Sequence, residues 1–445
     1  MSTSEQTFHS QEQPKNTEER SIPTEPSKSK GNGATRRAVV AGTIGVGVGI
    51  AATLGTQAVA KGLQTDGTSQ EAQPVLVGEK VPFFGERQAG IDTPAPAYAA
   101  FIALDLNETV TRDGLERLLR ILTDDAAKLT EGQAPVVDQE PELATVAAAL
   151  TVTLGFGERI FDIAGAAKPS WLKPLPAFKK IDRLQEQWND GDLLIQLCTE
   201  DRTTLAHAQR MLLKDARSFG RIRWIQEGFR RAYGSKTPGQ TMRNLFGQVD
   251  GTVNPNIEKG TMDDYVWGEF DSLQPWESGG TSLVLRRIHM NLDTWDQADR
   301  PAREDAIGRK LSNGAPLTGT EEHDIADLSA TNDLGFNVIA PYAHIRRANA
   351  QKPEEHILRR GYNYDMPVFD ASGFSEHGQA DGGISNTGLI FASYQADPVK
   401  QFVPIQKRLA ELDMLNTWTV PIGSAVFAIP GGCQPGGFIG EKLFT

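Results

Sequence analysis

Cysteine is scarce in this chain of 445 residues, which contains only Cys198 and Cys433. Because no Cys-x-x-Cys pair occurs, a zinc or iron–sulfur site built from cysteines is excluded. The two cysteines are far apart in the sequence, so the sequence alone does not predict whether they form a disulfide. Cys198 ends the apolar stretch DLLIQLC, which favours a packed thiol in the protein core.

Tracts of positive charge are missing as well. The formal net charge is −12, and no Lys/Arg-rich segment with interleaved aromatic residues is present. Residues 1–60 hold six basic and five acidic side chains, so the remainder of the chain carries a net charge of about −13. An acidic chain of this kind argues against nucleic acid and anionic membranes as partners.

Histidines with the spacing of a zinc site are also absent. No HExxH motif occurs, and no two of the six histidines after residue 60 are four residues apart. A single histidine can still hold a haem iron, which needs one axial imidazole. His344 is a candidate because Arg346 and Arg347 follow it and would suit two propionates; the alternative is a capping or core histidine beside solvated arginines.

The N-terminus has the features of an export signal. Residues 1–34 are polar and are expected to be disordered. Arg36 and Arg37 precede a Gly- and Ala-rich apolar run (38–54), and Ala58-Val59-Ala60 resembles a cleavage site, so residues 1–60 are predicted to form a twin-arginine signal peptide. A membrane anchor is the alternative, although the run is short for a span. The twin-arginine translocase exports folded proteins, which fits a cofactor enzyme in the periplasm or outside the cell.

The remaining residues show strand and helix patterns in the order β-α-β-β-α-β, twice. This order predicts an α+β fold with two ferredoxin-like domains, antiparallel sheets and peripheral helices, in residues 61–255 and 256–445. Thr111 is expected to cap the first helix. Strands are expected within 99–106, 144–157, 192–201, 281–292, 356–365 and 387–397, and helices within 112–132, 202–216, 295–311 and 398–412.

A glycine-rich turn lies near the middle of the chain, in the stretch NLFGQVDGTVNP (244–255). Gly247 and Gly251 permit positive φ angles and a close approach of the backbone to another group. Asp250 between them is either the aspartate of an ordinary β-turn or a functional carboxylate.

Several blocks together resemble the dye-decolourising peroxidase family, especially its exported branch with deferrochelatase-like members. The family turn G-x-x-D-G corresponds to Gly247–Gly251, followed by Thr252 and Asn254-Pro255. Similar blocks in the same order cover most of residues 81–435. They are GERQAGIDTP, LTVTLGFGERIFD, GDLLIQLCTED, GGTSLVLRRIHMNLDTWD, IGRKLSNGAPLTG, AHIRRAN, ILRRGYNYD and GLIFASYQAD.

The resemblance implies one haem b per chain, in the C-terminal domain. It implies that His344 is the proximal iron ligand, Asp250 the distal acid and Arg359 the distal arginine. Asp250 would shuttle a proton between the peroxide oxygens, and Arg359 would stabilise negative charge on the leaving oxygen. A positive neighbour favours an ionised carboxylate, so activity is expected to favour acidic pH. The other implied haem contacts are Gly251, Thr252, Val253, Asn349, Ala350, Gln351, Arg287, Leu389 and Phe391.

The sequence departs from the family pattern after His344. The branch often continues with Asn-Pro-Arg, whose arginine contacts a propionate, but this chain has Asn349-Ala350-Gln351. Arg287, Arg346 and Arg347 are the substitutes, and the sequence does not choose between them. The spacing also leaves Arg360 as an alternative to Arg359. The carboxylate that orients His344 is unassigned; Asp397 is one guess, but a helix N-cap is favoured for it.

The resulting prediction is a haem peroxidase that reduces hydrogen peroxide and oxidises an organic or metal-ion donor. The alternatives are a deferrochelatase-like protein that handles iron with uptake partners, and a haem-binding module without turnover. The sequence leaves open the natural electron donor and whether the chain forms a homo-oligomer.

Overall fold

The computed structural model describes residues 78–445, except 233, 236–239, 256–259, 269–273 and 369–383. The predicted signal peptide therefore lies outside the described residues. The predicted boundary between residues 255 and 256 stays a prediction.

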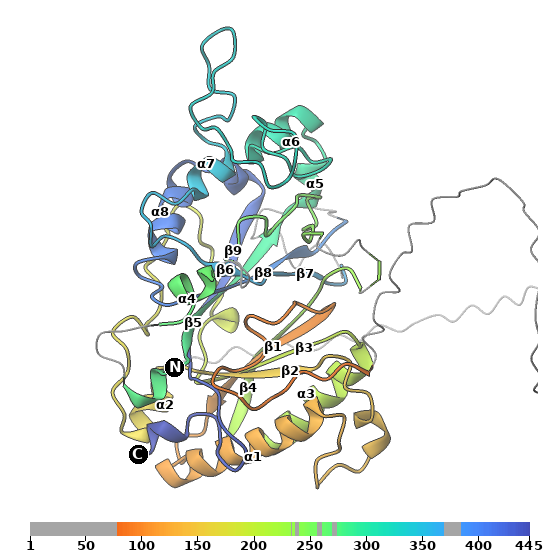
Figure 1. Ribbon diagram of the computed structural model, residues 1–445, viewed down its shortest axis with the longest axis vertical. Helices are drawn as coiled ribbons and strands as arrows, with labels where there is room; N and C mark the ends of the chain where they lie inside the picture. Colours follow the sequence, from red (N-terminus) through yellow and green to blue (C-terminus); the bar gives the residue numbers. More distant parts are fainter. Residues whose placement is uncertain (1–77, 233, 236–239, 256–259, 269–273, 369–383) are drawn as a thin grey trace, which may run out of the picture. The chain divides into compact units, whose positions relative to one another are not determined.

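The first half of the described chain forms an antiparallel sheet with the order β2-β3-β1-β4. The helices α1 and α3 pack on this sheet, in the lower part of Figure 1. This arrangement confirms the ferredoxin-like prediction. The elements are β1 (Tyr98–Leu106), α1 (Arg112–Thr130), η2 (Pro141–Ala144), β2 (Thr151–Phe156), α2 (Glu158–Ala164), η3 (Glu186–Trp188), β3 (Leu193–Thr199), α3 (Arg202–Ala216) and β4 (Gly220–Phe229).

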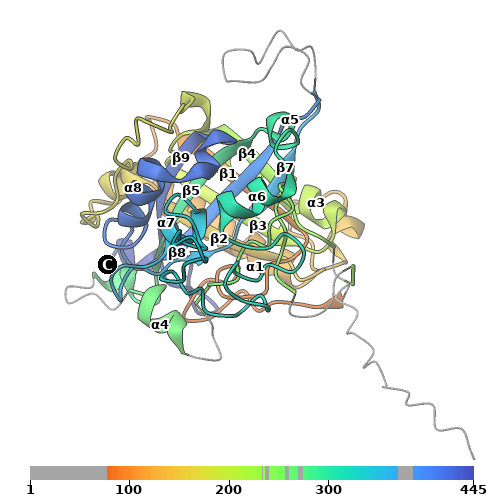
Figure 2. The same ribbon diagram turned by 90° about the horizontal axis from the view of Figure 1, so that it is seen from above.

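The second half repeats the arrangement with the order β9-β5-β8, and β8 also pairs with the short strands β6 and β7. In the view from above, α5 to α8 lie over these strands (Figure 2). The elements are α4 (Thr261–Tyr265), η4 (Pro275–Glu277), β5 (Thr281–Met290), α5 (Leu292–Trp295), α6 (Arg300–Ile307), α7 (His344–Ala348), β6 (Leu358–Arg359), β7 (Tyr362–Asp365), β8 (Thr387–Gln395), α8 (Phe402–Leu412), η7 (Met414–Thr417), β9 (Thr419–Ile429) and η8 (Glu441–Leu443).

The two sheets share an apolar core. Single bridges join their edges at Phe156–Ala428 and Phe229–Asn363. Along β1, Ala99 and Phe101 face the layer between the sheets, whereas Ile102 faces the layer under α1 and α3. Because successive side chains alternate between faces, a strand that is covered on both faces is apolar throughout. This explains the continuous apolar run that the sequence shows here.

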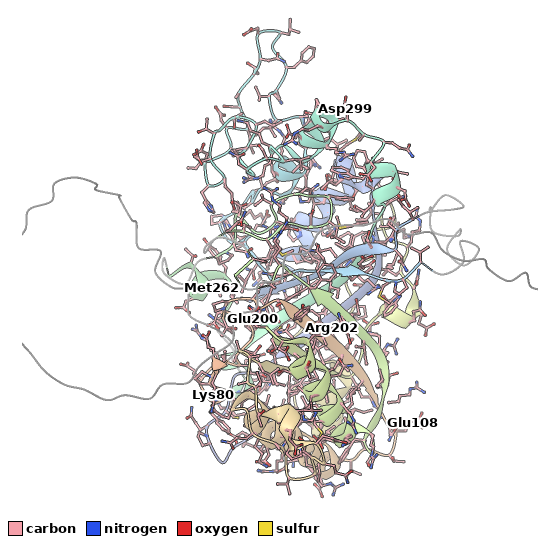
Figure 3. All side chains as sticks on the ribbon, turned by 90° about the vertical axis from the view of Figure 1, so that its right-hand side faces the viewer. Lys80, Glu108, Glu200, Arg202, Met262 and Asp299 are labelled. Atoms are coloured by element: carbon pink, nitrogen blue, oxygen red, sulfur yellow. The ribbon has the colours of Figure 1, made fainter. Side chains whose placement is uncertain are left out.

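Local signals determine several element boundaries. Thr111 caps α1 as predicted, because its side chain accepts a hydrogen bond from the amide of Gly114. Asp299 caps α6 in the same way, and Figure 3 shows it at the opposite end of the view from Glu108, which lies just after β1. The last long helix, α8, begins at Phe402 rather than at Pro398.

The sequence did not locate β9, because Pro421 and Gly423 disfavour a strand. The structure accommodates both residues at an irregularity in the ladder, where the register with β5 shifts between Arg287 and Ile288. A bulge tolerates proline because the missing amide hydrogen is not required there.

A carboxyl pair at the packing of α1 on α3 gives a testable pH dependence of stability. Burial, together with the charge of the adjacent Asp125, raises the pKa of Asp215 to about 7. The folded protein therefore binds more protons than the unfolded chain between about pH 4 and 7, so stability falls as the pH rises through this range. Replacing Asp215 with asparagine removes this loss. A shift of this size corresponds to at most about 4 kcal/mol, and partial solvent access reduces the expected gain at pH 8 to about 1–2 kcal/mol.

Urea unfolding at pH 5 and pH 8 measures the effect. The exposed Asp162 serves as a control, since Asp162→Asn should leave the pH dependence unchanged. An equal fall in stability between the two pH values in wild type and Asp215→Asn would contradict the assignment.

Candidate functional site

Asp250 lies at the end of a tight hairpin. Its amide donates a hydrogen bond to the carbonyl of Met242 (2.8 Å), and Arg243 bridges Val249 inside the hairpin. Gly247 and Gly251 have φ angles of +79° and +130°, which residues other than glycine rarely adopt. The turn therefore needs both glycines, and it directs the Asp250 carboxylate into a cavity.

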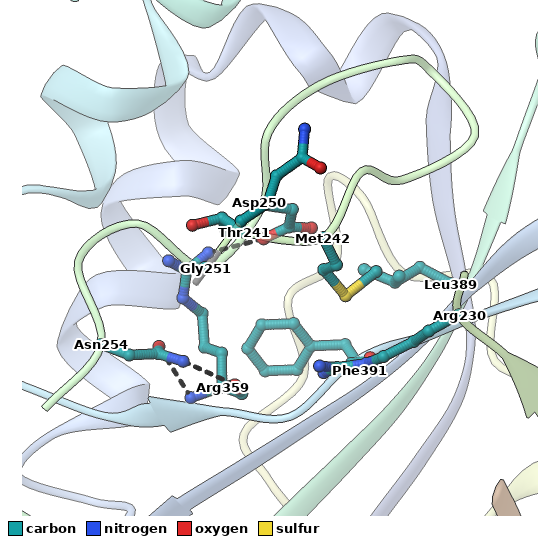
Figure 4. Close-up of a pocket in the computed structure, with 11 residues that line it drawn as sticks. Arg230, Thr241, Met242, Asp250, Gly251, Asn254, Arg359, Leu389 and Phe391 are labelled. Atoms are coloured by element: carbon teal, nitrogen blue, oxygen red, sulfur yellow. Dashed lines mark hydrogen bonds and ion pairs between the residues drawn. The ribbon is translucent and has the colours of Figure 1, made fainter. Parts of the chain in front are cut away.

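The carboxylate of Asp250 is paired with Arg359. Nη1 of Arg359 lies 2.8 Å from Oδ1 of Asp250, and the two side chains come from segments 109 residues apart. Asn254 holds the backbone of Arg359 with two hydrogen bonds, at 2.8 and 3.1 Å. Figure 4 shows this arrangement at the wall of the cavity.

The structure distinguishes Arg359 from its neighbour. Arg359 contributes to the cavity, whereas Arg360 is buried on the opposite side and donates hydrogen bonds to the carbonyls of Ile91 and Thr93. Alternation along the strand sends consecutive side chains to opposite faces, so only one of the two arginines can face Asp250.

His344 begins the short helix α7 and is paired with a buried aspartate. Its Nδ1 lies 2.6 Å from Oδ2 of Asp413. The other carboxylate oxygen of Asp413 accepts a hydrogen bond from the amide of Leu415, which fixes the carboxylate. In the neutral imidazole the proton is on Nδ1, since a carboxylate only accepts, and the lone pair of Nε2 remains available.

The imidazole of His344 lies within electrostatic range of Asp250 and Arg359. Burial alone lowers the pKa of His344, but the charge of Asp413 and the hydrogen bond to it outweigh burial, so the pKa lies above its usual value. The charges of Asp250 and Arg359 therefore act on His344, although His344 is not among the residues that line the cavity beside them.

The sequence did not identify Asp413 as the partner of His344. The two residues are 69 positions apart, and no local pattern links them. Asp397 accepts hydrogen bonds from the amides of Val399 and Lys400 in the turn that leads to α8. It does not contact His344, and its predicted N-cap role is wrong because α8 begins at Phe402.

The cavity contains some of the predicted contact residues. Gly251, Leu389 and Phe391 line it together with Asp250 and Arg359. Thr252 donates a hydrogen bond to Glu322 (3.0 Å), and Val253 is largely exposed.

The segment that follows α7 forms hydrogen bonds with α8 and with Glu355. The carbonyl of Asn349, before Ala350, accepts a hydrogen bond from Arg408, and the amide of Gln351 donates to Glu355.

Arg287 is not among the residues that line this cavity. Its guanidinium lies between the rings of Trp188 and Tyr364, 4.3 and 3.8 Å from their centroids. In its place the structure shows Arg230 in the cavity wall, a residue that the sequence analysis did not single out.

Glu322 was also missed by the sequence analysis. One of its carboxylate oxygens accepts hydrogen bonds from the hydroxyls of both Thr241 and Thr252, which stand on either side of the Asp250 hairpin. Glu322 therefore clamps the base of the hairpin.

Other kinds of site find no support in the part of the chain that the structure describes. No three His, Cys, Asp or Glu side chains form a metal cluster there, and Cys198 and Cys433 are both buried and free. None of the helices in these residues has the length and apolarity that a membrane span requires.

Two family models match most of the chain. The model for the N-terminal part of Dyp-type peroxidases matches residues 88–230, and the C-terminal one matches residues 241–434. A dye-decolorizing peroxidase from Thermobifida fusca is 35% identical over 448 residues, covering 94% of this chain and 99% of that protein. A deferrochelatase from Escherichia coli K12 is 33% identical, covering 89% and 95%.

Solved structures of Dyp-type peroxidases have the same fold as this chain. The DyP-type peroxidase from Cellulomonas bogoriensis is 49% identical, with a TM-score of 0.78, and the match covers 83% of this chain and 99% of that one. Ferric DtpA from Streptomyces lividans is 35% identical, with a TM-score of 0.77 and coverage of 84% and 100%.

The described residues fit a haem by the chemistry of their donors. A single imidazole has a lone pair free and a carboxylate behind it, as metal-bound histidines commonly do. The apolar Leu389 and Phe391 line the cavity beside a polar pair, Asp250 and Arg359. The chain therefore belongs to the Dyp-type peroxidase family, and it is a haem peroxidase.

Proposed function

We propose that this peroxidase binds its haem between His344 on one side and the Asp250–Arg359 pair on the other. The observation that carries the proposal is the convergence of two partly buried pairs, His344–Asp413 and Arg359–Asp250, from four separate segments. When bound, the haem supplies an iron that binds peroxide and takes up its oxidising equivalents.

The two distal side chains have different tasks in this proposal. Asp250 accepts a proton from one peroxide oxygen and returns it to the other as the O–O bond breaks and water leaves. Arg359 donates hydrogen bonds to the departing oxygen and stabilises its negative charge. Because Asn254 and Asp250 already hold Arg359 in place, little reorganisation is needed when peroxide arrives.

Absorption spectroscopy tests this function directly. Protein produced with haem should show a Soret band near 400 nm (roughly, for haem with one protein axial ligand) that changes on addition of one equivalent of peroxide. His344→Ala should weaken or shift the band. A Soret band that peroxide leaves unchanged would favour a haem-binding module, and folded protein without a Soret band would contradict the proposed site.

Asp413 is proposed to orient His344 and to make it a stronger ligand. Asparagine at this position still accepts the Leu415 amide hydrogen bond, so Asp413→Asn removes the charge and leaves the local turn intact. Loss of such an outer partner typically lowers metal affinity or activity about 10- to 100-fold. We expect faster haem loss and a higher reduction potential, measured by haem transfer and by spectroelectrochemistry. An unchanged potential would show that Asp413 has only a structural role.

Two versions of this function differ in the substrate: oxidation of a reducing donor, or release of iron from haem. The curated relatives include both a dye-decolorizing peroxidase and deferrochelatases. We propose oxidation of an organic or metal-ion donor as the main activity, and release of iron from haem, with iron-uptake partners, as the second candidate. Incubation with haem and analysis of the tetrapyrrole separates them, because iron release with an intact protoporphyrin ring would support the second.

We further propose export of the folded protein by the twin-arginine translocase, on the sequence of residues 1–60. Replacing Arg36 and Arg37 with lysine should retain the protein inside the producing cell. Normal export of this variant would exclude the route.

A further inference from the structure

The three arginines that the sequence offered for the haem propionates have other partners. Arg346 donates hydrogen bonds to the carbonyls of Ile339 and Leu328. Arg347 pairs with Glu411 and donates to the carbonyl of Arg408. Arg287 is stacked between two aromatic rings, as described above. The propionate partner of this chain must therefore be sought elsewhere.

Two contacts position Arg230 at the cavity. It directly follows β4, and its Nε donates a hydrogen bond to the carbonyl of Gly361 (2.8 Å). Its guanidinium lies 4.7 Å from the centroid of the Tyr362 ring. Figure 4 shows the side chain reaching toward Phe391 at the cavity wall.

The terminal nitrogens of Arg230 lack a carboxylate. Within the described ranges, neither Nη has a hydrogen bond to the protein, and no Asp or Glu lies within ion-pair distance of the guanidinium. Arg230 is partly buried, and this burial lowers the pKa of its guanidinium. Charges that are removed from water are normally paired. The charge of Asp250 acts on this guanidinium, but Asp250 forms its ion pair with Arg359.

The surroundings of Arg230 are suited to an anion. Besides the cavity with Asp250 and Arg359, Arg230 lines a second cavity together with Arg231 and Arg243. The two cavities share Thr241 and Met242, so they adjoin at Arg230. Arg230 therefore lies where the cavity that holds Asp250 and Arg359 meets a second cavity that is lined by further arginines.

We propose that Arg230 binds a haem propionate and takes the place of the arginine that the sequence lacks after His344. The proposal rests on the haem site described above. A guanidinium whose Nε is fixed and whose two Nη are free offers a planar pair of donors, which matches the two oxygens of a carboxylate.

Haem transfer tests the proposal with a chemical control. Holoprotein is loaded either with protohaem or with its dimethyl ester, which has no carboxylates, and release to excess apomyoglobin is followed in the Soret region. Arg230→Gln is expected to release protohaem about 10- to 100-fold faster, the range of a charged hydrogen bond. The release of the dimethyl ester should not change.

Three further variants make the result interpretable. Arg217→Gln, at an exposed position that lines neither cavity, should leave both release rates unchanged. Arg230→Lys, which keeps a positive charge without the planar fork, should give an intermediate rate and replaces Arg230→Gln if that protein does not fold. His344→Ala should accelerate the release of both haems, so failure of the haem site itself is distinguishable from failure of the Arg230 assignment.

Two results would overturn the proposal. Equal acceleration for protohaem and its ester would mean that Arg230 only packs the pocket. Unchanged haem release, combined with a higher KM for carboxylated donors but not for uncharged ones, would assign Arg230 to an anionic substrate instead.

Discussion

Replacing Asp250 with asparagine is expected to lower kcat/KM for hydrogen peroxide by about two to four orders of magnitude, the usual contribution of a positioned acid–base group. Asparagine is nearly the same size and still accepts the hydrogen bond from Asn244, so the hairpin should keep its form. It cannot take up and return a proton, and the loss should therefore appear in the peroxide step. Stopped-flow measurement of the Soret change against peroxide concentration gives this rate constant.

The control for Asp250→Asn is the binding of haem. Haem content and the resting Soret band should match those of wild type, because Asp250 is not proposed as an iron ligand. Glu322→Gln is a matched variant in which the clamp on the hairpin retains an oxygen acceptor, and it should lose far less activity. A near-normal rate in Asp250→Asn would show that another group moves the proton.

Replacing Arg359 with alanine is expected to lower the same rate constant by about two to three orders of magnitude, the cost of removing one preorganised donor from a developing negative charge. The variant also leaves Asp250 without its ion-pair partner.

Arg359→Lys separates charge from geometry. Lysine keeps the positive charge but has a single, flexible ammonium group, so partial activity is expected. Asn254→Ala removes the two hydrogen bonds that fix the Arg359 backbone and should give a smaller loss of about 1–2 kcal/mol in transition-state stabilisation. Full activity of Arg359→Ala would contradict a catalytic role for this residue.

The residues that could be found from sequence are those with a local or family pattern. Asp250 lies between two glycines whose positive φ angles the turn requires, and His344 and Arg359 lie in blocks similar to the family. Asp413 and Glu322 have no such pattern, because each acts on a partner about 70 or more positions away. Nothing near Asp413 in the sequence distinguishes it from a carboxylate that caps a short helix.

Choices between neighbouring or similar residues also needed the structure. Arg359 and Arg360 are adjacent, and only the pairing of β6 with β8 shows which of them faces Asp250. Likewise, charge alone does not distinguish the four candidate arginines for an anion, which are Arg230, Arg287, Arg346 and Arg347. Their hydrogen bonds and ring contacts decide which of them remains free for an anion.

The sequence by itself determined the α+β fold class, because alternation of apolar residues, helix caps and glycine turns act over a few positions and are visible in one dimension. Its resemblance to the family implied the haem peroxidase. The sequence indicated two α+β units of the same order, an acidic chain and a single-histidine haem site. Only the tertiary structure decided which carboxylate supports His344, which arginine stands beside Asp250 and which one is left unpaired. Those answers depend on distances between segments up to 131 residues apart, which sheet pairing and core packing determine.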